Sequence, residues 1–531
     1  YMKTRFNWAS HYTLHPSVKH AEEQNAFMLK DALDVEAVKN YISEFKFDNA
    51  RRLRLHSVIS QQINSLSNLP AAVINNLNLL KQDTTFTVAC GHQLVLWTGP
   101  LFVWTKIAHT ISLCKQLKQQ FPKYNFIPVY WLASEDHDYK EIQSVHLNQK
   151  QYQWSVTSEG PVGCIKPNSA LHDLSQNLFD SIKEFPHAAS FCSLIKLFEE
   201  SNNLSEAIQK VLYALFGSEG LICLDANCKE LKTSFKNILK GDVLHSETLT
   251  AAATTMRSWT ENRWKPVIGF RACNMFYLHE GTRKRLDVCT NGLCLSDQSE
   301  VWKREEMEQL IEDAPERFSP NALLRPVYQQ YVLPNLVYVA GPQEKAYWLQ
   351  LPSVMKHYQV FFPLLPIRYM IVPIRSKDER ITQKLGLNFT DWFKPESELV
   401  QDIFKSQSQA LNTQEILNRF KSQILPLGAP LYEIEGSLKS AFEAETQKYL
   451  NRIEHLAEKS NSHRKNKNTE LKERVFEVLN SIMPQHRVNE RTEHGGTWYL
   501  HYGPEFIKLL IETCEHFNGE IVFKTFNTLK S

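Results

Sequence analysis

The sequence of 531 residues lacks the features that mark membrane proteins, nucleic-acid binders and cysteine-based metal sites. No apolar run approaches the roughly 18 residues of a membrane-spanning helix, and the formal net charge is only +2. The ten cysteines include no CxxC pair, so a cysteine-based zinc site is not expected. We therefore expect neither nucleic acid nor a membrane as a partner.

The composition and the first residues favour a reducing compartment. The hydrophobic content of 43% and the charged content of 22% are typical of globular proteins. The first segment is mixed and polar, with Tyr1 ahead of Met2, and has no apolar core of a signal peptide. Several cysteines stand in apolar runs, among them Cys90 and Cys223, as reduced core cysteines do. These features predict a cytoplasmic protein.

The chain from residue 85 to residue 133 has the pattern of a βαβ unit. Two β-branched and apolar runs, 85–90 and 126–133, predict buried parallel strands. Between them, apolar residues recur at helical spacing after Pro100. Open α/β sheets bind ligands where loops leave the carboxyl ends of their strands. The pattern predicts an α/β fold with a ligand site in the loops after these two strands.

The loop after the first predicted strand carries three candidate ligand-binding residues, Gly91, His92 and Gln93. Glycine allows a close backbone approach, and the two side chains can hydrogen-bond a ligand. Thr98 and Gly99 come next, and we expect Thr98 to cap a helix that has Pro100 in its first turn. The N-terminus of that helix would favour a carboxylate or phosphate.

The loop after the second predicted strand places three carboxylates around one imidazole. Trp131 precedes it, and it reads Ser134-Glu135-Asp136-His137-Asp138. Such a cluster beside a buried strand end is costly unless it is used. Its candidate catalytic residues are Asp136, Asp138 and His137, with His92 as the alternative base. Ser134, Glu135 and Trp131 are candidates for substrate binding.

A third predicted strand, 336–340, ends in the same kind of polar loop. Gly341 follows it directly, and Glu344 and Tyr347 lie three residues apart on one face of the next helix. Arg325 follows a turn that contains Asn321, and it is the expected partner of an anion. We expect these residues to face the same site.

Changes in composition divide the chain into five regions. They are the N-terminal helices with the first part of the core (1–150), inserted connective material (151–317), the second part of the core (318–395), a coiled coil (396–482) and a segment that returns to the core (483–531). Within the inserted region, strands are predicted at 220–225, 266–270 and 274–278.

The predicted coiled coil rests on repeats of seven residues. One seam reads Phe442, Tyr449 and Leu456, and a second reads Thr446, Ile453 and Ser460. Seams of this kind predict a homodimer, although an antiparallel pair with the preceding helix of the same chain is the alternative.

Several runs in one order resemble the bacillithiol biosynthesis cysteine-adding enzyme family. They are Gly91-His92-Gln93, Gly99-Pro100-Leu101-Phe102, Pro128-Val129-Tyr130-Trp131, Ser134 to Asp138, Phe318 to Pro326, Leu333-Pro334-Asn335 and Gly341 to Leu351. The family commonly has Gln at the position of His92, and the similarity is weaker over 485–493. The chain has no counterpart of the lysine-rich signature loop of class I aminoacyl-tRNA synthetases.

The resemblance implies a fold, an activity and a set of partners. The fold is a Rossmann-like core similar to the nucleotide-binding fold of class I aminoacyl-tRNA synthetases, with connective insertions and a C-terminal coiled coil that mediates dimerisation. The activity is that of a ligase that adds L-cysteine to glucosaminyl-malate (malyl-glucosamine) through an amide bond. Activation of the cysteine carboxyl by ATP or another nucleotide is expected, and no metal is firmly implied.

Two other functions remain open from the residues alone. The cluster of Glu135, Asp136, His137 and Asp138 could serve a metal-dependent hydrolase, since hard carboxylates with imidazole suit zinc or manganese. Four adjacent residues cannot all face one ion from an extended loop, which counts against that reading. The third possibility is a nucleotide-binding dimeric scaffold without catalysis.

Overall fold

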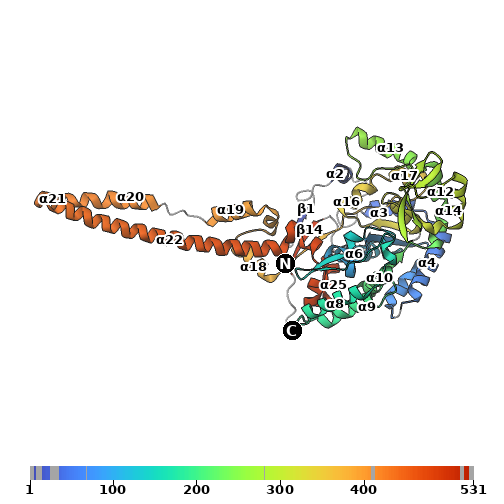
Figure 1. Cartoon of the computed structure of the whole chain (residues 1–531), viewed down its shortest axis with the longest axis horizontal. Helices are drawn as coiled ribbons and strands as arrows, with labels where there is room; N and C mark the ends of the chain where they lie inside the picture. The colour runs from blue at the N-terminus through green and yellow to red at the C-terminus, as the bar shows by residue number, and fades with distance from the viewer. Residues whose placement is uncertain are drawn as a thin grey trace. The chain divides into compact units, whose positions relative to one another are not determined.

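The computed structural model describes residues 5–7, 15–23, 35–66, 68–279, 281–407, 413–514 and 520–525. The chain forms two compact units, which we call the core unit (residues 1–373 with 489–531) and the helical unit (374–488) (Figure 1). The helical unit begins at 374, whereas the change in composition placed the start of the coiled coil at 396. None of the described helices is both long enough and apolar enough to cross a membrane.

A four-stranded parallel sheet lies at the centre of the core unit. Its strand order is β12 (Asn335–Tyr338), β2 (Thr85–His92), β3 (Asn125–Leu132) and β6 (Ile222–Asp225). The first pair of predicted strands is confirmed, because β2 and β3 pair in parallel along their full length. These strands are buried almost throughout, which agrees with their apolar, β-branched sequences.

Strand β6 corrects the predicted extent of the inserted region. Residues 220–225 were placed in that region, but β6 pairs in parallel with β3 and belongs to the central sheet. Its apolar sequence could not separate a core strand from a strand of the insertion, because both are buried.

Helix α6 (Leu101–Gln120) connects β2 to β3, and its start differs from the prediction. Thr98 lies in the short turn η1 (Leu96–Thr98), where its Oγ1 accepts a hydrogen bond from Trp104 Nε1 at 2.9 Å. The residue before the helix is Pro100, without a side-chain cap, and the Leu101 N–H donates to the carbonyl of Glu493 at 2.8 Å. The expected capping role of Thr98 is therefore wrong, because a neighbouring indole takes its hydroxyl.

An antiparallel sheet and a set of helices surround the central sheet. The antiparallel sheet has the order β10 (Val301–Trp302), β9 (Gly292–Leu295), β8 (Thr282–Cys289), β7 (Met275–His279) and β11 (Phe318–Pro320). The predicted strand at 274–278 is confirmed as β7, but 266–270 is not a strand. The N–H groups of Val267 and Ile268 donate to the Gln350 side chain instead of to a strand.

The helices of the core unit include those predicted near the N-terminus: α2 (Pro16–Glu23), α3 (Val35–Glu44), α4 (Asn49–Asn64) and α5 (Ala71–Leu79). Further along the chain come α8 (Ser169–Ile182), α9 (Ala188–Glu199), α10 (Leu204–Phe216), α11 (Lys229–Ser234), α12 (Lys236–His245), α13 (Glu247–Glu261), α14 (Arg304–Asp313), α15 (Leu324–Val332), α16 (Pro342–Trp348) and α17 (Pro352–His357).

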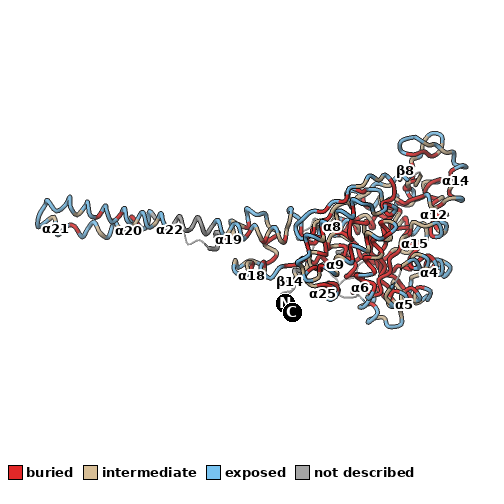
Figure 2. The backbone as a smooth tube through the Cα atoms, turned by 60° about the horizontal axis from the view of Figure 1, so that its bottom comes forward, coloured by how far each residue is buried: buried red, intermediate tan, exposed pale blue. Residues whose placement is uncertain are grey.

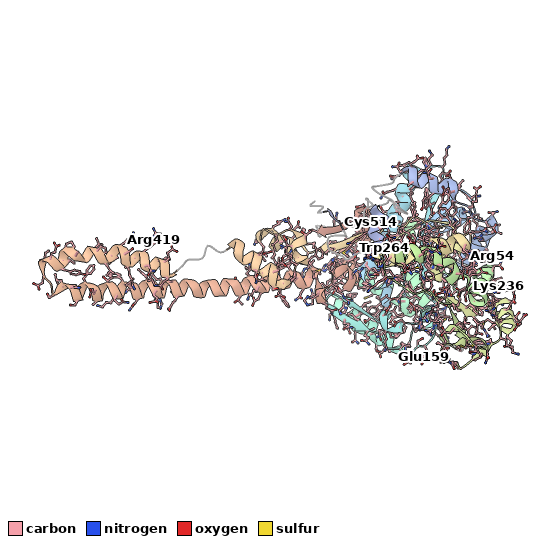
Figure 3. All side chains as sticks on the ribbon, turned by 90° about the horizontal axis from the view of Figure 1, so that it is seen from above. Arg54, Glu159, Lys236, Trp264, Arg419 and Cys514 are labelled. Carbon is pink, nitrogen blue, oxygen red and sulfur yellow. The ribbon has the colours of Figure 1, made fainter. Side chains whose placement is uncertain are left out.

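The chain after residue 489 packs against the central α/β unit. Helices α23 (Asn489–Thr492), α24 (Gly496–Tyr502) and α25 (Glu505–Thr513) follow one another, and α25 lies against α6. Ser112 on α6 donates a hydrogen bond to the carbonyl of Cys514, which is labelled in Figure 3, at 2.5 Å. Strand β14 (Glu520–Thr525) joins β1 (Arg5–Asn7) and β13 (Met370–Ile374) in a small sheet.

The helical unit contains a long helix with shorter helices against it. They are α18 (Ser376–Lys384), α19 (Glu396–Gln407), α20 (Thr413–Ile424), α21 (Ala429–Ile434) and the long α22 (Leu438–Ile482). Helix α20, which carries Arg419 in Figure 3, lies along α22 of the same chain. Residues of both helices are buried at this contact, including Leu417, Thr446 and Leu450.

The first predicted seam of the coiled coil remains largely exposed within one chain. Tyr449 is 55% exposed and Leu456 is 66% exposed, and this part of α22 is mostly pale blue in Figure 2. In the second seam Thr446 is buried, and the side chain of Ser460 lies outside the described residues. The intrachain helix pair therefore uses the second seam and leaves Tyr449 and Leu456 uncovered.

Candidate functional site

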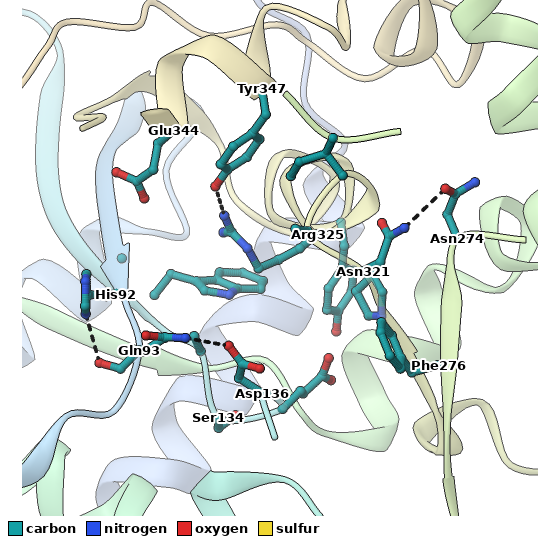
Figure 4. Close-up of a pocket in the computed structure, with 18 of the residues that line it drawn as sticks. His92, Gln93, Ser134, Asp136, Asn274, Phe276, Asn321, Arg325, Glu344 and Tyr347 are labelled. Carbon is teal, nitrogen blue, oxygen red and sulfur yellow. Dashed lines mark hydrogen bonds between the residues drawn. The ribbon is translucent and has the colours of Figure 1, made fainter. Parts of the chain in front are cut away.

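A cavity of about 990 Å³ opens at the carboxyl ends of β2, β3 and β12. Its walls come from the loops after these strands, from residues 268–276 and from β8, α15 and α16. Figure 4 shows Arg325 and Tyr347 near its middle, with His92 and Glu344 on one side and Asn274 and Phe276 on the other. The cavity therefore lies where the doubly wound arrangement predicts a ligand site.

Most residues proposed for the site from the sequence line this one cavity. They are Gly91, His92, Gln93, Trp131, Ser134, Glu135, Asp136, His137, Asn321, Arg325, Gly341, Glu344 and Tyr347. Three others do not line it. Thr98 and Gly99 stand before α6, with Thr98 buried against Trp104, and Asp138 is an exposed residue before the short helix α7 (Tyr139–Ile142).

Asp136 is held by donors on several sides. Gln93 Nε2 donates to its Oδ2 at 3.0 Å, and the His137 N–H donates to its Oδ1 at 2.8 Å. The guanidinium of Arg283 lies 3.9 Å from the same Oδ1. Burial raises the pKa of this carboxyl, but the hydrogen bonds from His137 and Gln93 and the charge of Arg283 hold its pKa well below the usual range. Asp136 is therefore ionised at neutral pH.

His92 is a neutral hydrogen-bonding group. Burial, together with the charge of Lys106, lowers the pKa of His92 to about 4. Its Nδ1 lies 3.3 Å from the carbonyl of Gln93, an acceptor, so the proton belongs on Nδ1 and the lone pair on Nε2. The ring also packs edge-on against Phe102.

Lys106 and Glu344 form an ion pair that joins α6 to the start of α16. Lys106 Nζ lies 2.5 Å from Glu344 Oε2 and also donates to the carbonyl of Gly91 at 2.8 Å. Glu344 further accepts from the Gly341 N–H at 2.6 Å and from the Tyr338 hydroxyl at 3.1 Å. Burial alone would raise the pKa of Glu344. The charge of Lys106 and the hydrogen bonds from Lys106 and the Gly341 N–H have the larger effect, so the pKa lies below its usual value. The pair holds together the loops after β2 and β12.

Among the described residues, the hydrogen-bond partners of the Arg325 side chain are neutral. It donates to the hydroxyl of Tyr347 at 2.7 Å and to Oε1 of Gln329 at 3.1 Å. Glu344, the nearby carboxylate, is already paired with Lys106. Arg325 thus offers the cavity a guanidinium that no carboxylate contacts directly, which suits the binding of an anion.

The side chain of Glu135 points away from Asp136 and toward α11 and β11. It pairs with Lys232, whose side chain is almost fully buried, and accepts from the Ser319 hydroxyl at 2.8 Å. Ser319 in turn accepts from Nε of Arg283 at 3.1 Å. These contacts tie the loop after β3 to α11, β11 and β8.

The sequence prediction missed the residues that the inserted region contributes. Arg271, Asn274, Phe276 and Arg283 all line the cavity, although they lie far along the chain from the loops of the central sheet. The sequence feature that points to these residues is the charged turn that includes Arg283. The neighbouring sequence does not show which surface of the protein that turn covers. Arg368 and Arg491 were also missed.

The loop after β3 is not arranged as a metal centre. Glu135 points to Lys232 and Ser319, while Asp136 faces Gln93. Across the described part of the chain, no group of three or more His, Cys, Asp and Glu side chains is placed to hold a metal ion.

The fold and the cavity define a class of protein: a Rossmann-like α/β protein with an arginine-lined cavity at the carboxyl ends of its parallel strands. Two family models match the chain. Residues 9–369 match the N-terminal Rossmann-like domain of bacillithiol biosynthesis BshC, and residues 371–524 match its C-terminal coiled-coil domain. The chain belongs to this family.

Curated relatives agree with that assignment. Proteins named "Putative cysteine ligase BshC" are 30% identical in Flavobacterium psychrophilum, over 89% of each chain, and 29% identical in Flavobacterium johnsoniae, over 88% of each chain. The protein of that name in Christiangramia forsetii is 30% identical over 90% of each chain. The predicted family, the Rossmann-like fold and the coiled coil are confirmed. The names agree with the predicted ligase and with neither the hydrolase nor the scaffold.

Proposed function

We propose that this protein is a ligase that joins L-cysteine to glucosaminyl-malate by an amide bond in bacillithiol biosynthesis. The observation that carries the proposal is one cavity that holds both an ionised Asp136 and an Arg325 without a carboxylate partner. The first suits an ammonium or amine, and the second suits a carboxylate or phosphate. The names of the relatives support the same reaction.

A nucleotide supplies the activation in this proposal. A free carboxylate does not acylate an amine, so its oxygen first bonds to a phosphorus atom of ATP or another nucleotide, and the P–O bond to the departing pyrophosphate or nucleoside diphosphate breaks. The amine nitrogen then attacks the carboxyl carbon, the bond to the phosphate oxygen breaks, and nitrogen releases one proton. Arg325 would counter the charge of the phosphates, whereas Lys106 and Arg368 are already paired with Glu344 and Glu490.

Asp136 orients the attacking amine in this scheme. Because the pKa of Asp136 is held well below its usual range, its carboxylate is a weak proton acceptor but a stable partner for N–H groups. His92, neutral with a pKa of about 4, serves as a hydrogen-bonding group in the same cavity. His137 accepts from Arg283 at 2.9 Å and so helps to fix the loop that carries Asp136.

A homodimer through the coiled coil is part of the proposal. Tyr449 and Leu456 form an apolar seam on α22 that the shorter helices of the same chain leave exposed. Burial of such a seam against a second copy would remove it from water. We also propose a reducing, cytoplasmic setting, since all ten cysteines are free and most are buried or half-buried.

The experiment is a reconstitution with purified protein. L-cysteine, glucosaminyl-malate and one nucleoside triphosphate at a time are supplied, and the amide product is followed by mass spectrometry. Product that requires all three components supports the ligase. If no nucleotide gives product, the proposed function is wrong.

A further inference from the structure

Two arginines of the inserted region face the cavity, and among the described residues neither has a carboxylate within hydrogen-bond distance. Arg271 is exposed at the cavity wall, and among the described residues its guanidinium has no hydrogen-bond or ion-pair partner. Arg283 is mostly buried and lies 3.9 Å from Asp136, beyond hydrogen-bond distance. Arg285, also at the cavity, is already taken by a two-pronged pair with Asp287 at 2.7–3.1 Å.

Arg283 is rigidly oriented. Its plane stacks on Phe276 at 3.8 Å, Nε donates to Ser319, and the two terminal nitrogens donate to His137 at 2.9 Å and to the Pro320 carbonyl at 3.2 Å. A guanidinium has five N–H groups, so two remain for a ligand. A fork that is fixed in advance loses little entropy when it binds a carboxylate.

These arginines lie on the side of the cavity away from the ends of β2 and β12. Arg283 stacks on Phe276, and the backbone of Arg271 hydrogen-bonds Asn274. Figure 4 places Phe276 and Asn274 opposite His92 and Glu344. In folds of this kind the ends of the parallel strands hold the nucleotide, which leaves the far side for the second substrate.

We propose that Arg283 and Arg271 form a subsite for the two carboxylates of the malyl group of glucosaminyl-malate. This inference rests on the proposed function, because it names which half of the cavity takes the acceptor. Glucosaminyl-malate differs from a simple glucosaminide by a dicarboxylate, and a pair of guanidiniums recognises that difference. With the malyl group at this subsite, the sugar amine reaches toward Asp136, which lies beside Arg283.

The test measures the binding of each substrate separately. Arg283→Gln and Arg271→Gln should each weaken the binding of glucosaminyl-malate, measured by calorimetry, by about tenfold or more, the scale of a lost charge-assisted hydrogen bond. The KM for L-cysteine should stay near that of the wild type. Methyl glucosaminide, which keeps the amine but has no carboxylates, should be used equally poorly by all three proteins.

Lys284→Gln is the matched control. Lys284 is the next residue on β8, projects to the other face of the strand and pairs with Asp297 at 2.8 Å. Removal of its charge should not change the affinity for glucosaminyl-malate. Because the Arg271 side chain is exposed and makes no hydrogen bond or ion pair with the described residues, Arg271→Gln tests the subsite with little disturbance of the fold.

The outcomes separate the subsite from the reaction. If the arginine variants bind glucosaminyl-malate like the wild type, or weaken both substrates equally, the subsite is wrong even where the wild type makes the amide. If the wild type binds glucosaminyl-malate through these arginines but makes no amide, the proposed reaction fails and the subsite stands.

Discussion

Asp136 and Asp138 stand two positions apart in one loop, yet only Asp136 lines the cavity. The difference comes from the local backbone. Asp136 turns inward, where Gln93 and its own neighbour His137 donate to it, while Asp138 is exposed before α7. At the residue scale, the site therefore depends on one carboxylate that is kept ionised by its donors.

Asp136→Asn should lower kcat/KM for amide formation by about 100-fold, the scale on which misplacement of a reacting group slows an enzyme. The amide is nearly isosteric, so the fold should survive, as circular dichroism would confirm. Asp138→Asn is the control and should turn over like the wild type, because Asp138 does not reach the cavity. Equal activity of both variants would remove Asp136 from the mechanism.

Some site residues could be predicted from the sequence because parallel strands end at a common edge. Gly91 lies at the end of a buried strand, and Asp136 and Glu344 each follow one, so local pattern alone brings them together. Arg271 and Arg283 could not be found this way. Their place depends on how the inserted sheet packs over the cavity, and no local periodicity encodes that contact.

His494 shows that the turn before α6 depends on a residue from the far C-terminal part of the chain. This fully buried ring links the C-terminal segment to the turn before α6, with Nε2 at 2.7 Å from the Trp97 carbonyl and Nδ1 accepting from the Gly496 N–H at 2.8 Å. Both nitrogens are used in the neutral form, and a proton on Nδ1 would face another N–H. Burial lowers the pKa of His494 to about 4.

Acid should weaken the core unit partly through His494. Its pKa is near 6.5 when unfolded and about 4 when folded, so the unfolded chain binds the proton first. The full stabilisation is present above pH 6.5 and is lost as pH falls toward 4, by up to about 3 kcal/mol. Urea unfolding at pH 7 and pH 4.5 should show a smaller loss for His494→Gln than for the wild type. An equal loss in both proteins would contradict this assignment.

At the scale of elements, the sequence predicts the helices and strands whose apolar residues recur at regular spacing. It fails where packing against distant residues decides the local structure. β2, α6 and β3 follow from their apolar patterns. The segment 266–270 is equally apolar, but the Gln350 side chain takes two of its N–H groups and it forms no strand. The Thr98 cap failed for the same reason, since Trp104 competes for the hydroxyl.

Across the whole molecule, the question of how the coiled coil pairs has a partial answer. Helix α20 packs on α22 within one chain, as the alternative from the sequence allowed. The seam of Tyr449 and Leu456 is left over, and its period of seven residues matches the predicted dimer contact. Both kinds of pairing can therefore coexist on α22.

Leu456→Glu should convert the proposed dimer into a monomer at micromolar concentration, because it places a charge in an apolar seam. Light scattering on the full chain measures the mass. Gln447→Glu, at an exposed position on α22 outside the seam, should leave the dimer intact. A wild-type protein that is already monomeric at this concentration would rule out the dimer.

The most direct test of the central claim follows the oxygen atoms of the cysteine carboxylate. L-cysteine labelled with ¹⁸O in its carboxyl group is converted in the presence of glucosaminyl-malate and the active nucleotide. The proposed ligase predicts that each amide formed transfers one ¹⁸O atom to the released phosphate or nucleoside monophosphate, because that oxygen bonds to phosphorus before the amine attacks. Amide formation without ¹⁸O in any phosphorus-containing product would contradict the account.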